Sequence, residues 1–242
     1  MLINFSYHLS ESTPFYKTLR SPRLERLYDL SKGDTCNSFY LTTSNHAGTH
    51  VDAPNHFNPD GRRITDYELS ELVFTRPALV DIQVDPDELI LPEHLLSCVA
   101  CRSDCDFLFV RSGFGSYRSN AETYIEHNPG FSKAAAAFLM DRFPRLKALA
   151  VDFASMAATA HMEEGCEAHR VFLGCGRYSD RPILLVEDIR FPEVMPALQR
   201  IFLIPWLFDG LDSAPCTLFA ETEDSAPTDS KEALTATQRR RA

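Results

Sequence analysis

The sequence predicts an α/β fold: a single domain built around a mixed β-sheet. Apolar, β-rich runs outnumber helical patterns along the 242 residues, and only one strand–helix–strand unit is clear, between residues 107 and 153. A regular doubly wound sheet alternates strands with helices, so this imbalance favours a mixed sheet. A chain of this length fits one large domain, or at most two small ones, and is long enough to bury a substantial core.

Each predicted element follows from a local pattern. Residues 132–144 (SKAAAAFLMDRFP) form the clearest helix, because a serine cap, good helix-forming residues and a proline stop occur together. Residues 87–96 and 166–173 are predicted as two further helical segments. Apolar, β-branched and aromatic runs predict strands at 38–42, 78–84, 107–113, 147–153, 183–189, 200–206 and 216–220.

The C-terminal end differs in composition from the rest. Residues 221–242 are rich in Glu, Asp, Ser, Thr and Lys and finish in RRRA. Such a segment has too few apolar side chains to bury a core, so we expect a flexible tail. The domain is therefore predicted to span residues 1–220.

Composition and charge limit the classes of function. The hydrophobic fraction of 44% and the charged fraction of 24% are typical of a soluble globular protein, and the formal net charge is -10. This charge argues against nucleic acid or an anionic membrane as a partner. No secretory signal and no apolar run long enough to cross a bilayer is visible, so we expect a cytoplasmic protein with reduced thiols.

Three of the seven cysteines are closely spaced, at Cys98, Cys101 and Cys105. Such thiols could bind zinc or an iron–sulfur cluster. A structural zinc site normally needs four ligands, and the only nearby histidine is His94, four residues before Cys98. Free thiols are therefore the favoured interpretation.

The stretch HAGTHVDAPNHF holds three histidines and an aspartate within twelve residues. In an extended chain, side chains two apart share a face, so His50 and Asp52 would point the same way. His46 joins them if Gly48 lets the chain bend. Two imidazoles and a carboxylate are a common ligand set for Zn²⁺ or Mn²⁺, and His56 could be a further ligand or a general base. The alternative is a hydrophilic loop with incidental histidines.

The same stretch resembles the HxGTHxDxPxHF signature of the cyclase family of metal-dependent hydrolases, which includes bacterial kynurenine formamidase and isatin hydrolase. The match includes the small residues, the threonine, the proline and the final phenylalanine. Further segments resemble family motifs in the same order, from about residue 3 to residue 220. These segments are FLFVRSGFGSY, NPGFSKAAAAFL, VDFASM, AHRVFLGCG, LLVEDI and FDGLDSAPCTLFA.

The resemblance implies a set of site residues. The implied metal ligands, for one or two ions of Zn²⁺ or for Mn²⁺, are His46, His50, Asp52, His169 and Glu187. The implied catalytic acid/base is His56, and Asp52 is placed to bridge two ions. The sequence departs from the family in two places: Arg170 stands where the family has a second histidine, and the insertion RYSDRP lengthens the spacing between His169 and Glu187. A surface loop absorbs such an insertion at low cost.

Two polar residues near these motifs need separate interpretations. His161 falls in a segment that varies in the family, so we expect it to lie outside the site. Asp152 ends an apolar strand, where open α/β sheets often carry functional groups. Asp152 either contacts and orients a ligand histidine without binding the metal itself, or caps the following turn.

The implied function is hydrolysis of a C–N amide bond in a small molecule, such as the aryl formamide N-formylkynurenine or the cyclic amide isatin. The ion lowers the pKa of water and polarises the carbonyl, while His56 transfers the proton, because imidazoles titrate near neutral pH. The alternatives are a polyketide-type cyclase or a ring-opening or lactone hydrolase of the same family, and, third, a non-catalytic metal-binding protein. The resemblance also implies a swivelling β/β/α-like fold and a homodimer or homotetramer.

Overall fold

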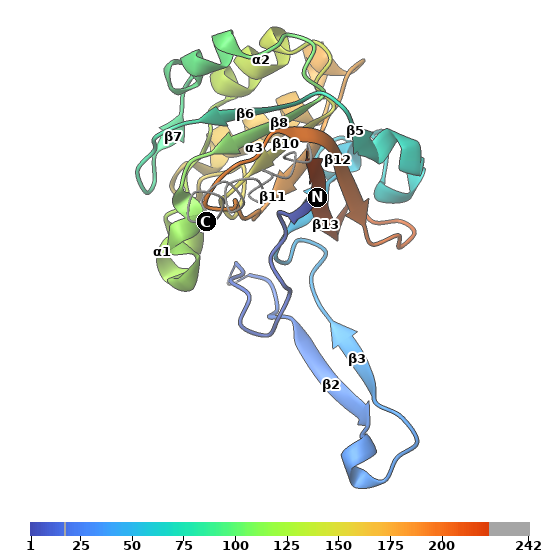
Figure 1. The fold of residues 1–242 in the computed structure, drawn as a ribbon. Helices are drawn as coiled ribbons and strands as arrows, with labels where there is room; N and C mark the ends of the chain where they lie inside the picture. The colour runs from blue at the N-terminus through green and yellow to red at the C-terminus, as the bar shows by residue number, and fades with distance from the viewer. Residues whose placement is uncertain (17, 223–242) are drawn as a thin grey trace, which may run out of the picture.

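The computed structural model describes residues 1–16 and 18–222. Within these residues, nine strands form one mixed sheet in the order β5-β12-β13-β4-β11-β10-β8-β6, with β1 paired to β13 (Figure 1). The strands are β1 (Leu2–Asn4), β4 (His50–Asp52), β5 (Val73–Phe74), β6 (Pro77–Asp81), β8 (Phe107–Arg111), β10 (Ala148–Val151), β11 (Leu184–Glu187), β12 (Leu198–Pro205) and β13 (Ser213–Thr222). The predicted α/β domain with a mixed sheet is confirmed.

The parallel half of the sheet contains β6, β8, β10 and β11. Helix α2 (Lys133–Arg142) connects β8 to β10, and helix α3 (Met162–Phe172) lies between β10 and β11. Both helices pack on one face, where they share a core with Leu149 and Val151. Ala148 and Ala150 alternate with these residues and face the second core, as the strand period of two requires.

The antiparallel half curls over that second core and gives the sheet a nearly barrel-like form (Figure 1). Strand β13 makes this possible, because it pairs with β4 through its first residues and with β12 and β1 along the rest. Phe5 from the N-terminal segment packs on Phe109 of β8, with ring centroids 4.9 Å apart. In the strand order, the short strand β4 lies between β13 and β11, next to the parallel half of the sheet.

A two-stranded hairpin, β2 (Arg23–Tyr28) and β3 (Ser38–Thr42), extends away from the domain (Figure 1). The predicted strand at 38–42 is confirmed, but it belongs to this hairpin and not to the main sheet. Every residue of β2 is exposed. Its sequence, RLERLY, lacks strict alternation and was not predicted as a strand.

Local predictions were mostly confirmed, with ends shifted by a few residues. The helix predicted at 87–96 is wrong: Leu89–Ile90 forms strand β7, paired to β9 (Gly130–Phe131), and a 3-10 helix follows at Pro92–Ala100. Pro92 disfavours a continuous α-helix, and the pairing with β9 decides the remainder. Helix α1 (Ala121–Glu126), which Asn120 caps, was not predicted.

The remaining elements are short. They are the 3-10 helices Leu30–Lys32, Pro54–His56, Ile64–Asp66, Leu69–Leu72, Phe114–Ser119, Thr159–His161 and Gly176–Tyr178. None of the helices among the described residues is long and apolar enough to cross a membrane. Strand β13 continues to Thr222, two residues past the predicted end of the domain, and the rest of the predicted tail lies outside the described residues.

Candidate metal centre

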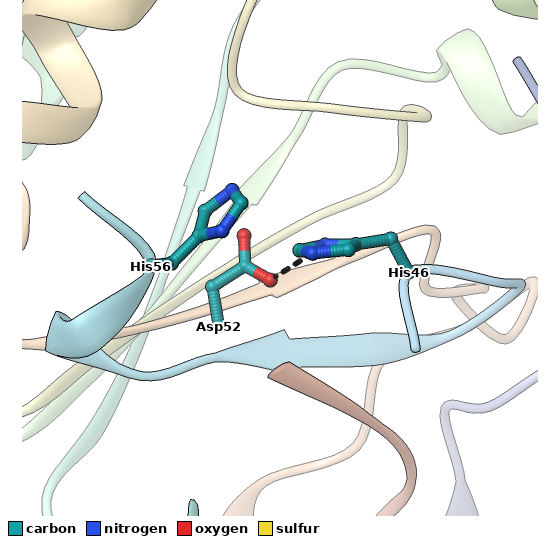
Figure 2. A group of neighbouring side chains, drawn as sticks. All are labelled: His46, Asp52 and His56. Carbon is teal, nitrogen blue, oxygen red and sulfur yellow. Dashed lines mark ion pairs between the residues drawn. The ribbon is translucent and has the colours of Figure 1, made fainter. Parts of the chain in front are cut away.

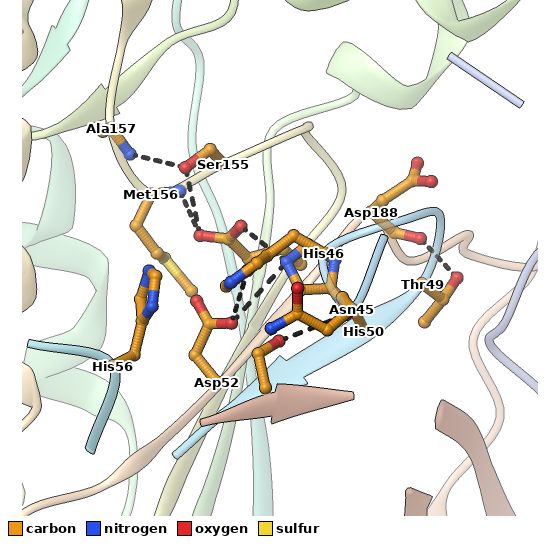
Figure 3. A network of polar contacts seen from close by, with 12 residues as sticks. Asn45, His46, Thr49, His50, Asp52, His56, Ser155, Met156, Ala157 and Asp188 are labelled. Atoms are coloured by element: carbon orange, nitrogen blue, oxygen red, sulfur yellow. Dashed lines mark hydrogen bonds and ion pairs between the residues drawn. The ribbon is translucent and has the colours of Figure 1, made fainter. Parts of the chain in front are cut away.

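His50 and Asp52 occupy the first and last positions of β4, so their side chains share one face of the sheet as predicted. Strand β11 runs antiparallel beside β4, and its last residue, Glu187, pairs directly with His50. The Nε2 atom of His50 lies 3.2 Å from Oε2 of Glu187 and 3.7 Å from Oδ1 of Asp52. The register of two strands that are distant in sequence therefore creates the centre of the site (Figure 3).

The chain turns sharply on both sides of β4, and the turns bring in two further histidines. Gly48 has a φ angle of +64°, in the left-handed region that favours glycine, and the bend places Nδ1 of His46 3.1 Å from Oδ1 of Asp52 (Figure 2). Pro54 begins a one-turn 3-10 helix that ends at His56. Figure 2 shows His46 and His56 on either side of the Asp52 carboxylate. The sequence prediction that Gly48 bends the chain is confirmed.

His169 reaches the same point from α3, more than a hundred residues later. Its Nδ1 atom lies 2.8 Å from the carbonyl oxygen of Gly165, one turn earlier in the helix, and its Nε2 atom lies 3.5 Å from Oε1 of Glu187. His50 is held in the same way, with Nδ1 2.8 Å from the carbonyl oxygen of Gly48. A carbonyl accepts a hydrogen bond from Nδ1–H, so in both rings it is Nε2 that faces the carboxylates, and in the neutral ring Nε2 carries the lone pair that a cation needs.

Two groups of potential ligands result, and Asp52 belongs to both. His46, Asp52 and His56 form one group, and His50, Asp52 and Glu187 form the other, with the ligand atoms of each group all within 4.8 Å of one another. Asp52 is thus the residue placed to be shared if two ions bind. His56, predicted from the sequence as a further ligand or a general base and implied by the resemblance as the acid/base, also lies within ligand reach.

Three atoms at this point are buried without a hydrogen-bond partner among the described residues: Nε2 of His50 and both carboxylate oxygens of Asp52. Buried polar groups are almost always satisfied, so three such atoms on adjacent side chains require a partner. One imidazole nitrogen and two carboxylate oxygens are suitable ligand atoms for Zn²⁺ or Mn²⁺. The residues present therefore fit a divalent cation.

The electrostatics of the cluster also favour a bound cation. Burial lowers the pKa of His46, but the carboxylates of Asp52 and Asp212 outweigh burial and raise it to about 10. Burial and the charge of Asp52 raise the pKa of Glu187, but the neighbouring imidazoles of His169 and His50 outweigh both effects and lower it to about 2. The site keeps its carboxylates ionised and attracts either protons or a cation.

Asp212 is a site residue that the sequence analysis missed. Its Oδ2 atom lies 2.7 Å from Nδ1 of His56 and 3.6 Å from Nε2 of His46, and its Oδ1 accepts a hydrogen bond from Asn45. The residue immediately before β13 reaches the site because Ser213 pairs with Asp52 across the sheet. The available signal was the aspartate in FDGLDSAP, one of the segments that carry the family resemblance.

The segment after β10, which contains Ser155, Met156 and Ala157, lies beside the cluster (Figure 3). Oε1 of Glu187 accepts hydrogen bonds from the backbone N–H of Met156, at 2.6 Å, and from the hydroxyl of Ser155, at 3.3 Å. These contacts leave Oε2 facing His50. They also explain why the VDFASM segment lies beside the site without donating a ligand side chain.

Several predicted candidates lie elsewhere. Both carboxylate oxygens of Asp152 accept hydrogen bonds from Ser112 and Gly113, so Asp152 caps the turn after β8, and the interpretation that it orients a ligand histidine is not supported. His161 is exposed at the start of α3, outside the site as expected. The insertion 177–182 packs against α2, where Tyr178 contacts Asp141, so it leaves the positions of the ligands undisturbed.

The described thiols of the closely spaced set also lie outside the ligand cluster. Cys101 and Cys105 are free thiols, as expected, and each donates to a backbone carbonyl oxygen. The Cys98 side chain is outside the described part of the structure.

A cavity of about 270 Å³ opens onto the cluster. The ligand side chains line its floor. Its walls are largely apolar and come from the N-terminal segment, the turn after β4, the chain after β10 and the start of helix α3: Tyr16, Leu19, Phe57, Ala154, Ala157 and Met162. Phe57 stacks on the ring of His169, with centroids 4.7 Å apart. The cavity can hold a small, mostly apolar molecule with one polar group directed at the cluster.

Comparisons with known proteins agree with this picture. The profile of a family described as "Putative cyclase" matches residues 3–158. Kynurenine formamidase from Geobacillus thermodenitrificans is 22% identical over 213 residues, which cover 88% of this chain and 93% of that protein.

Two solved structures share the fold. Isatin hydrolase A from Labrenzia aggregata, bound to benzyl benzoate, has a TM-score of 0.75 and 18% identity and covers 92% of this chain and 93% of its own. A predicted metal-dependent hydrolase from Bacillus stearothermophilus has a TM-score of 0.68 and 18% identity, with coverages of 91% and 97%.

Proposed function

Since the chain belongs to the cyclase family, we propose that it is a metal-dependent hydrolase that cleaves the C–N bond of an amide. The substrate class is an aryl formamide such as N-formylkynurenine or a cyclic amide such as isatin. Two relatives named for these activities, a kynurenine formamidase and an isatin hydrolase, support the proposal. The observation that carries the proposal is the set of three buried ligand atoms on His50 and Asp52 that have no hydrogen-bond partner within the described part of the chain.

One or two ions would be held by five side chains: His46, His50, Asp52, His169 and Glu187. When bound, Zn²⁺ or Mn²⁺ supplies a Lewis acid that activates water and polarises a carbonyl oxygen. The protein fixes the ligands before any ion arrives, because backbone carbonyls hold His50 and His169 and a backbone N–H holds Glu187.

His56 and Asp212 are assigned the proton transfer. Asp212 accepts the hydrogen bond from Nδ1–H of His56, which leaves Nε2 of His56 free to take a proton from water. Water oxygen bonds to the carbonyl carbon, the C–N bond breaks, and His56 returns the proton to the leaving nitrogen. The Asp212 carboxylate stabilises the imidazolium between these two transfers.

The cavity walls orient the remainder of the substrate. Phe57 and Tyr16 present aromatic surface, and Leu19 and Met162 present aliphatic surface, so an aryl ring can pack beside the cluster with its amide directed inward. Apolar walls also exclude bulk water, which strengthens the electrostatic interactions within the site.

A hydrolysis screen tests the proposal. Protein loaded separately with Zn²⁺ and Mn²⁺ is assayed on N-formylkynurenine, isatin and simple aryl formamides, with the His56→Ala variant as a control for background metal catalysis. We expect turnover of at least one amide by the wild type and a loss of about a hundredfold or more in the variant. Failure on every amide, with turnover of a lactone, would favour the ring-opening alternative within the family. Metal binding without any turnover would favour a non-catalytic protein.

The proposal includes self-association as a homodimer or homotetramer. The β2–β3 hairpin supports it, because Leu24, Tyr28, Tyr40 and Leu41 are exposed and an isolated two-stranded hairpin is only marginally stable in water. Size-exclusion chromatography with light scattering should give the mass of two or four chains. Replacing Leu24 and Leu41 with serine should lower that mass. A single-chain mass for the wild type would contradict self-association.

A further inference from the structure

Asp188 directly follows Glu187, the last residue of β11, and has an unusual backbone. Its φ angle is +53°, in the left-handed region that non-glycine residues rarely adopt. The Asp188 side chain is buried, and Figure 3 shows its carboxylate lying apart from the ligand cluster. A buried charge on a strained backbone persists only where the surroundings hold both in place.

The polar groups of Asp188 are held from several directions. Arg118 makes a bidentate ion pair with its carboxylate, with Nε 2.7 Å from Oδ1 and Nη2 2.8 Å from Oδ2. The hydroxyl of Tyr124 donates a 2.6 Å hydrogen bond to Oδ1. On the backbone, the carbonyl oxygen accepts from the Thr49 hydroxyl at 2.5 Å, and the N–H donates to the carbonyl oxygen of Phe153 at 2.9 Å.

Arg118 is itself fixed in place. Its side chain is only 16% exposed, and its guanidinium stacks over the ring of Tyr7, 3.8 Å from the centroid. Arg118 belongs to the 3-10 helix Phe114–Ser119, and Tyr124 belongs to α1. This region donates no ligand side chain to the cluster. It nevertheless binds Asp188, the residue next to the ligand Glu187.

Adjacent residues share a peptide unit, so a shift of Asp188 moves the backbone of Glu187 and its carboxylate. We propose that Arg118 is a positioning residue: its bidentate ion pair with Asp188 holds Glu187 where the cluster needs a carboxylate. This inference rests on the proposed function, because it takes the cluster to be a cation site. Arg118 does not touch the substrate or the ion, and it acts through Asp188 alone.

The test compares two Arg→Lys substitutions in metal-free protein. Arg118→Lys keeps the charge and loses the bidentate geometry. The matched control is Arg111→Lys, because Arg111 makes a bidentate pair of the same type with Asp81, on strands β8 and β6. Zn²⁺ affinity is measured by competition with a chromophoric chelator, and the Co²⁺-loaded proteins are compared by visible absorption, which reports ligand geometry.

We expect Arg118→Lys to weaken Zn²⁺ affinity by about ten- to a hundredfold and to change the Co²⁺ spectrum. Arg111→Lys should leave both at wild-type values. Asp188→Asn provides a second variant, because asparagine tolerates the left-handed backbone but weakens the pairing with Arg118. Asp188→Asn should weaken Zn²⁺ affinity and change the Co²⁺ spectrum as Arg118→Lys does. If Arg118→Lys does not fold, the result for Asp188→Asn tests the proposal alone.

Wild-type affinity and spectrum in folded Arg118→Lys and Asp188→Asn would overturn the inference, whatever happens to their melting temperatures. A wild type that binds Zn²⁺ but hydrolyses no amide would contradict the proposed function alone. The Zn²⁺ affinities of the variants would still test the role of Arg118. A wild type that binds no ion would overturn both.

Discussion

Nδ1 of His56 lies 2.7 Å from Oδ2 of Asp212, although 156 positions separate the two residues. The pair resembles the histidine–carboxylate pairs that orient a general base in other hydrolases. Asp212 fixes which nitrogen of His56 carries the proton, and it faces His46 as well, at 3.6 Å. One carboxylate therefore links the proposed proton carrier to the edge of the ligand cluster.

Asp212→Asn should reduce kcat by about ten- to a hundredfold with a smaller effect on KM. The amide keeps the shape of the side chain, but it removes the negative charge that stabilises a protonated His56. Steady-state kinetics on the metal-loaded protein measures the effect. Asp209→Asn, an exposed substitution in the same loop, is the control and should match the wild type. Equal kcat values for Asp212→Asn and the wild type would remove Asp212 from the mechanism.

Gly165→Ala should destabilise the fold and weaken metal binding. Alanine normally stabilises a helix relative to glycine, but here the new Cβ would lie 2.4 Å from Cβ of Ala157. Helix α3 must shift, and Gly165 supplies the carbonyl that holds His169. Overpacking of this kind costs about 1–3 kcal/mol. Thermal unfolding and Zn²⁺ titration check the prediction, with Glu163→Ala on the exposed side of α3 as control. A higher melting temperature for Gly165→Ala would show that α3 does not pack as described.

Metal-free protein should lose stability as the pH rises above neutrality. The pKa of His46 is raised from 6.5 to about 10, so its contribution is complete below pH 6.5 and is lost as the pH rises toward 10. The pKa of Glu187 is lowered from 4.5 to about 2, so its contribution is present above pH 4.5 and is lost as the pH falls toward 2.

A bound cation replaces the protons on the histidines, so the gain in melting temperature on adding metal should increase over the same alkaline range. Circular dichroism melts with a chelator and with Mn²⁺, from about pH 5 to about pH 9, separate the two effects. A chelated protein whose melting temperature rises steadily across that range would contradict the described charges.

The local part of the site could be predicted from the sequence, and the distant part could not. His50 and Asp52 share a face because strand side chains alternate, and Gly48 is the residue type that a sharp bend needs. The position of Asp212 in the site depends on the pairing of Ser213 with Asp52, and no local sequence pattern specifies that strand register. The assignments of His169 and Glu187 came from the family resemblance, not from spacing.

The fold follows the same division. Helix α2 and strands β8 and β10 carry strong local signals, and their predicted positions are confirmed. Leu89 and Ile90 lie in a segment with helical character, yet they pair with Gly130 and Phe131, so a tertiary contact outweighs local preference. The curl of the sheet depends on one strand, β13, pairing with different neighbours along its length, which its sequence does not reveal.

Calorimetric titration of metal-free protein with Zn²⁺, and separately with Mn²⁺, tests the central claim most directly. Asp52 belongs to both ligand groups, so the wild type should bind one or two ions per chain saturably, and Asp52→Asn should lose that binding. Folded wild-type protein that shows no saturable binding of either ion would contradict the account.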